Sequence, residues 1–184
     1  KTTAEPVFNI EEILDESTLE IKILEDWHVD KITGTTRQKV IEINVAEWWP
    51  GQDYRVPVRL IVPLKGKAKG FWVNGRLPYK YFLKDDVGQT DFNAKLLANG
   101  VGIVETVVKV LKDIPGNENL QQKMMKKFVE DFNPRYNTIW AWSMTLMRAA
   151  TAAYSETDYF EKGKVASSGG SKNGISPAVA LIND

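Results

Sequence analysis

Lys164-Val-Ala-Ser-Ser-Gly-Gly-Ser-Lys-Asn-Gly174 is the segment whose local pattern is the most informative in this chain. The segment from Val165 to Ser168 is typical of a short strand, and it runs into the pair Gly169-Gly170. From Ile175 onward apolar residues resume at helical spacing. A strand, a tight turn and a helix are therefore predicted here.

Ser171 stands where such a turn would present its side chain. A serine at the apex of a strand-turn-helix unit is a nucleophile elbow, whose backbone requires small neighbours on both sides. Gly169 lies two residues before Ser171, but Asn173 takes the second glycine position and the glycine follows at Gly174. The match to G-x-S-x-G is partial. The alternative is a plain glycine-rich connection, although the spacing of nucleotide-binding loops is absent.

The composition fits one well-buried globular domain. The chain has 184 residues, 43% hydrophobic and 26% charged, with 24 basic residues balancing 24 acidic ones. A neutral total without a basic cluster argues against a nucleic-acid binder or a polybasic membrane anchor. Cysteine is absent, which excludes disulfides, thiolate metal sites and a cysteine nucleophile.

The two ends of the sequence suggest processing or truncation. No apolar run approaches the length of about 18 residues that a membrane span needs, and six acidic residues in the first 20 positions exclude a retained secretory signal. The chain starts with Lys1 and not Met, so a removed signal peptide and a secreted or periplasmic location stay open. It stops inside the helix expected after Ser171, so we expect the N-terminal portion of a longer protein.

The first half of the chain has the two-residue alternation of antiparallel strands, after a lead-in segment at residues 1–18. Leu19, Ile21 and Ile23 are predicted to share a buried face. Gly34 turns the chain into the next alternating run, which predicts an antiparallel hairpin. The strands predicted in this half cover residues 19–24, 39–46, 55–63 and 69–74.

The second half alternates helices with buried strands. Val101 to Leu111 is almost continuously β-branched, which predicts a strand buried on both faces. Thr138 to Ser155 carries apolar residues at helical spacing, with alanines that suit close packing on a sheet. Further helices are predicted over residues 91–98 and 119–132.

This order of elements predicts an α/β-hydrolase-like fold. An antiparallel start followed by alternating helices and strands gives a mainly parallel sheet flanked by helices, with an N-terminal antiparallel hairpin. Ser171 would follow the fifth main strand. Residues 19–184 are accordingly predicted to form the N-terminal portion of a single such domain.

Four segments carry a resemblance to a known family. They are Leu-Ala-Asn-Gly-Val-Gly-Ile-Val-Glu at 97–105, Lys-Asp-Ile-Pro-Gly at 112–116, the helix at 140–154 and Ser-Gly-Gly-Ser-Lys-Asn-Gly at 168–174. Over roughly residues 55–184 the chain resembles the PhoPQ-activated pathogenicity-related protein family, and more distantly the glucuronoyl esterases. Both are similar to α/β-hydrolases and carry the second elbow glycine three residues after the serine, as Gly174 does. The resemblance implies that the triad's acid and histidine lie beyond Asp184.

The resemblance implies a serine hydrolase without a cofactor or a metal. Ser171 would attack the ester or amide carbonyl of a small molecule or peptide, activated by a histidine that an acid orients. The backbone N–H of Lys172 and an N–H at Asn74 or Gly75 would bind the oxyanion. The Lys172 side chain would either add positive charge there or be solvated.

His28, the single histidine, does not fit this mechanism. It precedes Ser171, which is the wrong side for the chain order of an α/β-hydrolase triad. Asp26 and Asp30 could orient it or build a metal site with it, but an ordinary surface histidine is the favoured interpretation. A triad cannot be assembled from these 184 residues alone.

A non-catalytic binding or scaffold protein is the alternative function, because the fold alone does not fix an activity. Trp48-Trp49 could form a ligand platform, although aromatic residues beside Pro50-Gly51 more often hold such a turn against the core. A hydrolase lacking its later strands would expose part of its sheet. We therefore expect aggregation, a homo-oligomer or association with the remaining C-terminal part.

Overall fold

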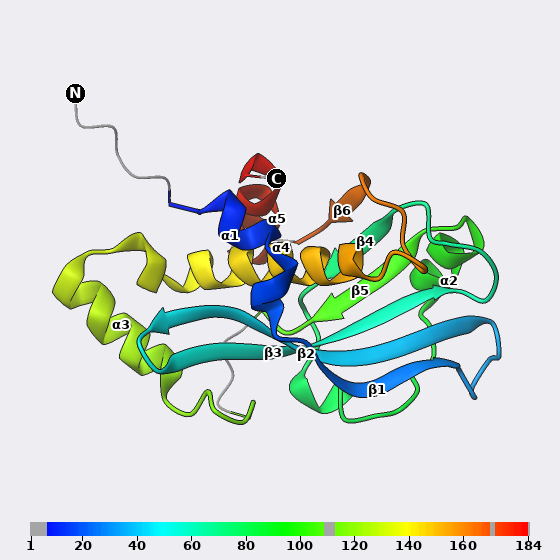
Figure 1. Cartoon of the computed structure of the whole chain (residues 1–184), viewed down its shortest axis with the longest axis horizontal. Coiled ribbons are helices and arrows are strands. Elements are labelled where there is room, and N and C mark those ends of the chain that lie inside the picture. Colours follow the sequence, from blue (N-terminus) through cyan, green and yellow to red (C-terminus); the bar gives the residue numbers. More distant parts are fainter. Residues whose placement is uncertain (1–6, 109–112, 170–171, 184) are drawn as a thin grey trace.

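Six strands form one mixed sheet in the computed structural model, which describes residues 7–108, 113–169 and 172–183. The strand order across the sheet is β1-β2-β3-β5-β4-β6 (Figure 1). The strands are β1 (Lys22–Val29), β2 (Thr36–Trp49), β3 (Gln52–Pro63), β4 (Phe71–Asn74), β5 (Gly102–Thr106) and β6 (Val165–Ser167).

Helices follow the strands in the order expected of an α/β protein. The α-helices are α1 (Ile10–Leu14), α2 (Asp91–Ala98), α3 (Leu120–Asp131), α4 (Thr138–Ser155) and α5 (Lys172–Asn183). Short 3₁₀ turns are η1 (Glu16–Leu19), η2 (Tyr79–Tyr81) and η3 (Pro134–Tyr136). In these described ranges no helix is long and apolar enough to cross a membrane.

The sheet changes from antiparallel to parallel at β5. Strands β1, β2, β3 and β5 pair antiparallel, whereas β5, β4 and β6 pair parallel. The connection from β4 to β5 runs through α2, and the connection from β5 to β6 runs through α3 and α4. The predicted α/β fold class, with an antiparallel hairpin at one edge of the sheet, is confirmed.

The helix α4 covers one face of the sheet, and its predicted bounds are those observed. Its alanines Ala149, Ala152 and Ala153 are fully buried, which lets the helix lie close to the sheet (Figure 1). Side chains of β3 and β5, such as Leu60 and Val104, complete this core. On the opposite face a smaller cluster forms from Ile61, Val87, Leu97 and Ile103.

The predicted buried face of the first strand is wrong. Leu19 is fully buried but belongs to η1, whereas Ile21 and Ile23 are 38% and 52% exposed. The strand starts only at Lys22, and its pairing with β2 shifts register on both sides of Glu25. Because such bulges change which side chains face the core, alternation in the sequence does not report burial here.

The strand β5 is shorter than the predicted run from Val101 to Leu111, of which residues 109–111 lie outside the described part. Val107 leaves the pairing with β3 and bridges Arg76, and the N–H of Val108 donates to the Gly75 carbonyl at 3.1 Å. These contacts with the loop after β4 end the strand.

The tryptophan pair holds the β2–β3 turn against the core. Trp48 is buried, with its ring 5.5 Å from that of Tyr54 and 5.1 Å from that of Trp140. Trp49 is half-buried and packs edge-on against Tyr136. The structural interpretation of the pair is confirmed.

Arg148 fixes the N-terminal segment to α4 and β2. Its guanidinium is buried and donates to the carbonyls of Glu12, Ile13 and Asp15 at 2.9–3.0 Å. It also donates to Thr18 Oγ1 and the Asn44 carbonyl. Burial lowers the pKa of Arg148, and the acceptor oxygens supply the stabilisation that water would otherwise give.

Replacing Arg148 with Met keeps most of the side-chain volume but leaves the oxygen atoms that accept its hydrogen bonds without a donor. We expect a loss of about 3 kcal/mol in unfolding free energy, the scale of breaking a buried hydrogen-bond network. This loss is measured by urea unfolding, with tryptophan fluorescence as the signal. The control Arg37→Met removes two bonds to carbonyls from a half-buried arginine and should cost about 1 kcal/mol. Equal losses in both variants would contradict the role of Arg148.

Candidate functional site

The candidate site lies where the parallel strands β4 and β6 end. Their register pairs Val73 with Ser167, so the turn at Asn74-Gly75 lies beside the turn that begins at Ser168. Neighbouring strands lie about 4.8 Å apart. Two turns that the sequence analysis assigned to the nucleophile and the oxyanion hole are therefore adjacent.

The strand-turn-helix unit is present on both sides of the predicted nucleophile. Strand β6 ends at Ser167 and α5 begins at Lys172. Gly170 and Ser171 themselves lie outside the described residues, as does the side chain of Lys172. What the structure gives is the frame around the predicted nucleophile: the strand before it, the helix after it and the two outer glycines.

Gly174 has the close contact that a tight turn requires. A Cβ on Gly174 would lie 3.0 Å from the carbonyl oxygen of Gly169 and 3.3 Å from its carbonyl carbon. Such a distance is tighter than side chains normally accept, so the first turn of α5 packs directly on the backbone of the preceding turn. This contact accounts for the displaced second glycine of the motif.

Gly75 is packed against Val108, just after β5, and against Leu146 in the middle of α4. A Cβ there would lie 2.0 Å from Val108 Cγ1 and 3.1 Å from Leu146 Cδ2. Asn74 Oδ1 accepts a hydrogen bond from the backbone N–H of Arg76, two residues later, at 3.2 Å. The loop after β4 is thus held firmly at the edge where an oxyanion-binding N–H is expected.

The serines before the turn have other roles. Ser167 Oγ donates to the Val73 carbonyl at 2.9 Å and so ties β6 to β4. Ser168 follows the strand, whereas the sequence analysis placed it inside. A small apolar pocket of about 30 Å³ lies at this edge, with room for about one water molecule. Its lining residues are Val73, Leu146, Met147, Ala150, Val165, Ser167 and Ala180.

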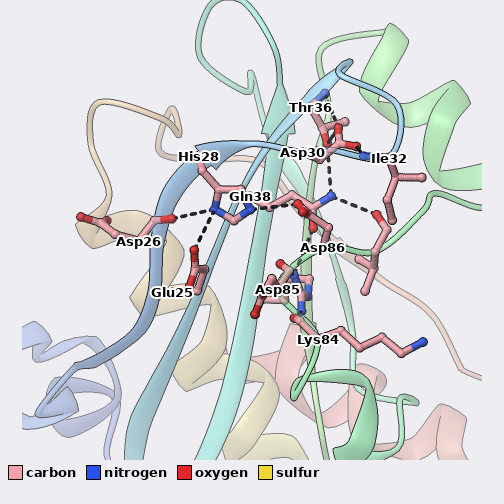
Figure 2. Close-up of polar contacts among 12 residues, drawn as sticks. Glu25, Asp26, His28, Asp30, Ile32, Thr36, Gln38, Lys84, Asp85 and Asp86 are labelled. Carbon is pink, nitrogen blue, oxygen red and sulfur yellow. Dashed lines mark hydrogen bonds and ion pairs between the residues drawn. The ribbon is translucent and has the colours of Figure 1, made fainter.

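His28 lies far from this edge. It belongs to β1, and five strand spacings, about 24 Å, separate β1 from β6. In Figure 2 its ring points toward Asp86, with Nε2 2.9 Å from Asp86 Oδ1, while Nδ1 lies 2.8 Å from the Asp26 carbonyl oxygen. Burial disfavours the imidazolium, but the contacts with Asp26, Asp86 and Glu25 outweigh it and raise the pKa of His28.

The carboxylates expected beside His28 act elsewhere. Asp30 accepts the N–H groups of Thr33 and Thr36 at 2.7 and 3.0 Å and so shapes the β1–β2 turn. Burial would raise its pKa, but these and further hydrogen bonds lower it to about 2. In the described ranges no group of three or more His, Cys, Asp or Glu side chains could hold a metal ion.

A buried arginine holds the loop between β4 and α2. Arg59 on β3 donates to Gln38 Oε1 at 3.1 Å, to the Asp85 carbonyl at 2.9 Å and to the Lys84 carbonyl. Gln38 in turn donates to the Val87 carbonyl at 3.0 Å. Strands β2 and β3 therefore bind the loop that starts at Asn74-Gly75.

Glu105 completes this network, and the sequence analysis did not single it out. It is 2% exposed, accepts the Tyr81 hydroxyl and Asn93 Nδ2, and lies opposite Arg59 in the β3–β5 register. Burial raises the pKa of Glu105, and it also raises that of Tyr81. The sequence does contain a signal for Glu105: it is a carboxylate inside a nearly continuous apolar strand, and a buried carboxylate needs buried partners.

Comparisons with solved structures show the fold. The chain is similar to a CE15 glucuronoyl esterase from Teredinibacter turnerae, with a TM-score of 0.58 and 16% identity over 91% of this chain and 43% of that chain. It is similar to a glucuronoyl esterase from Solibacter usitatus, with a TM-score of 0.61 and 13% identity over 100% of this chain and 59% of that one. A promiscuous CE15 esterase from a marine bacterial metagenome gives a TM-score of 0.54 and 15% identity, over 85% of this chain and 47% of that chain.

These matches support the predicted likeness to glucuronoyl esterases at the level of the fold. The chain spans 43–59% of the length of these three structures. No family model matches the chain, and no curated protein gives a significant match to its sequence. These comparisons with known proteins give no support to the predicted resemblance to the PhoPQ-activated family.

The ion pair of His28 makes stability depend on pH. Because the pKa of His28 is raised in the fold, its contribution is fully present below pH 6.5, its ordinary pKa, and is lost as pH rises through the folded value. We expect the stability difference between the wild type and His28→Gln to shrink over this range. The effect should stay below about 1 kcal/mol. Thermal melts of both proteins between pH 5 and 9 measure it, and Asp86→Asn should flatten the profile similarly.

Gly75→Ala tests the packing of the loop after β4. Its methyl group would overlap Val108, so we expect a loss of about 2 kcal/mol or more in unfolding free energy. Gly88→Ala is the control, since its Cβ would meet only Ile32 Cγ2 at 3.9 Å and should change stability by less than about 0.5 kcal/mol. A neutral Gly75→Ala in chemical unfolding would show that this loop can move.

Proposed function

We propose that this chain is part of a serine hydrolase of the α/β-hydrolase type that acts on an ester carbonyl, with Ser171 as the nucleophile. One observation carries the proposal. The turn between β6 and α5 packs through Gly169 and Gly174 as a nucleophile elbow would, beside the turn at Asn74-Gly75.

The proposed reaction is acyl transfer through the serine. Ser171 Oγ attacks the carbonyl carbon while a histidine accepts its proton, and the carbonyl oxygen becomes an oxyanion. The N–H of Lys172, at the start of α5, and an N–H at Asn74 or Gly75 stabilise this charge, assisted by the helix dipole. The alcohol leaves with the proton from the histidine, and water then hydrolyses the acyl-enzyme.

An ester is favoured over an amide as the substrate. The solved structures with similar folds are described as glucuronoyl esterases and as a promiscuous esterase. An ester of a uronic acid is therefore the first substrate to test. Membership in the PhoPQ-activated family is the finer sequence-based proposal that a full-length sequence would test.

The base of the proposed reaction is not His28. That residue lies at the opposite edge of the sheet, is bound to Asp86 and is the single histidine of the sequence. We propose that the histidine and acid come from a longer chain, since the solved structures that it resembles are about twice its length. Without them, a binding or scaffold role is the competing function.

Ser171→Ala in the full-length protein tests the assignment. We expect loss of labelling by a fluorophosphonate probe and a decrease in ester hydrolysis on the order of 10³-fold or more, the scale set by loss of a triad member. The melting temperature should change little. Ser168→Ala is the matched control, three residues earlier, and should keep both labelling and activity. Undiminished labelling of the Ser171→Ala protein would refute the nucleophile, and an unlabelled wild type would favour the binding role.

A further inference from the structure

Glu105 lies in a row with one residue of each neighbouring strand. The antiparallel register pairs it with Arg59 of β3, and the parallel register pairs it with Asn74 of β4. Residues paired across a sheet have their side chains on the same face. This face also carries Ile103, two residues before Glu105, and the cluster that packs against α2. A buried carboxylate therefore lies beside the last residue of β4, where the proposed oxyanion-binding turn begins.

The carboxylate of Glu105 binds the connection that follows this turn. It accepts the hydroxyl of Tyr81, which belongs to η2, and it accepts Nδ2 of Asn93, in α2, at 3.4 Å. The guanidinium of Arg59 lies over the Tyr81 ring, 5.4 Å from its centroid. Tyr81 is thus held at its hydroxyl by Glu105 and at its ring by Arg59.

The connection between β4 and α2 needs such contacts to keep one conformation. It runs over residues 75–90, and η2 is the regular structure that it contains. Connections of this length without helices or strands are uncommon and usually functional. The residues after β5 bind only its first part, through the bridge of Val107 with Arg76 and the bond from the Val108 N–H to the Gly75 carbonyl.

A requirement for stability alone does not explain this buried network. Arg59 and Glu105 are 0% and 2% exposed, and both belong to strands that are otherwise largely apolar. Replacing buried charges of opposite sign by apolar residues of similar volume is often neutral or stabilising. Hydrogen bonds to a buried carboxylate are directional, so they select one position of the bound segment where apolar contacts would accept several.

We propose that Glu105, acting through Tyr81, is a positioning residue for the oxyanion-binding N–H at the Asn74-Gly75 turn. The inference rests on the proposed hydrolase function. Glu105 fixes Tyr81, Tyr81 fixes η2, and η2 belongs to the same connection as the turn. A group that stabilises a transition state has to be held within about 0.5 Å of its productive position. The oxyanion exists only after attack on the carbonyl, so a displaced N–H lowers kcat and leaves KM nearly unchanged.

Amide hydrogen exchange of the 184-residue chain, followed by NMR, tests the positioning without any activity. The probe is the N–H of Arg76, which donates to Asn74 Oδ1 across the turn. In Tyr81→Phe we expect this N–H to exchange about fivefold faster or more, because the turn opens more often. Tyr79→Phe is the matched control from the same 3₁₀ turn, and it should leave the exchange unchanged. The Tyr79 hydroxyl has no hydrogen bond to any residue in the described ranges.

Steady-state kinetics of the full-length protein on an ester test the catalytic consequence. Tyr81→Phe should lower kcat about tenfold or more, a part of what the loss of a whole oxyanion-hole donor costs, and should keep KM within about twofold. Tyr79→Phe should leave both constants unchanged. Glu105→Gln keeps an oxygen that can accept the Tyr81 hydroxyl, so its kcat should fall less than that of Tyr81→Phe. A purely structural role would lower the melting temperature and leave kcat and KM unchanged.

The two experiments separate this inference from the proposed function. Unchanged exchange at Arg76 in Tyr81→Phe would overturn the positioning role, whatever the activity of the protein. In a wild type that reacts with the fluorophosphonate probe, an unchanged kcat of Tyr81→Phe would overturn it as well, and so would an equal loss in Tyr79→Phe. A full-length wild type without labelling or hydrolysis would refute the proposed function instead. The exchange of the Arg76 N–H would then still decide whether Tyr81 and Glu105 hold the turn.

Discussion

The parallel pairing of β4 with β6 is the constraint on which the candidate site depends. Because these strands run in the same direction and in register, they end level with each other, and their following turns meet at one edge. Gly75 and Gly174 allow the backbone of each turn to approach its neighbours more closely than any side chain would permit. The site is thus defined by backbone geometry before any reactive side chain is considered.

Two buried arginines donate hydrogen bonds to backbone carbonyls that have no partner in a helix or strand. Arg148 binds the carbonyls of the N-terminal segment, and Arg59 binds those of the loop between β4 and α2. Both segments lack strand partners for these carbonyls, so a buried donor with several N–H groups satisfies several of them at once. Glu105 lies opposite Arg59 and takes the Tyr81 hydroxyl, which brings the same loop onto β5. The loop that follows Asn74-Gly75 is therefore bound from three strands.

The sequence predicted what depends on local pattern and missed what depends on distant contacts. The bounds of α4 and α2 follow from local sequence pattern, and both are confirmed; in the structure Thr90 caps α2 by accepting the N–H of Asn93. The early end of β5 is set by Arg76 and Gly75, which lie some 30 positions away in the chain, and no local pattern reports them. The carboxylate that is hydrogen-bonded to His28 is likewise remote: it belongs to Asp86, in another loop, and not to Asp26 or Asp30. The strand and the helix on either side of the predicted elbow could be predicted because they depend on consecutive residues.

Pro177 bears on how α5 could serve an anionic intermediate. It lies inside α5, five residues after Lys172, where it removes one N–H from the second turn. The N–H groups at the start of a helix have no intrahelical acceptor in any case, and these are the groups that would face an oxyanion. Proline therefore weakens the interior of α5 without removing a donor from its first turn. Burial of Pro177 and Ala180 ties the helix to the rest of the fold, so the orientation of its N-terminus depends on tertiary packing more than on helix propensity.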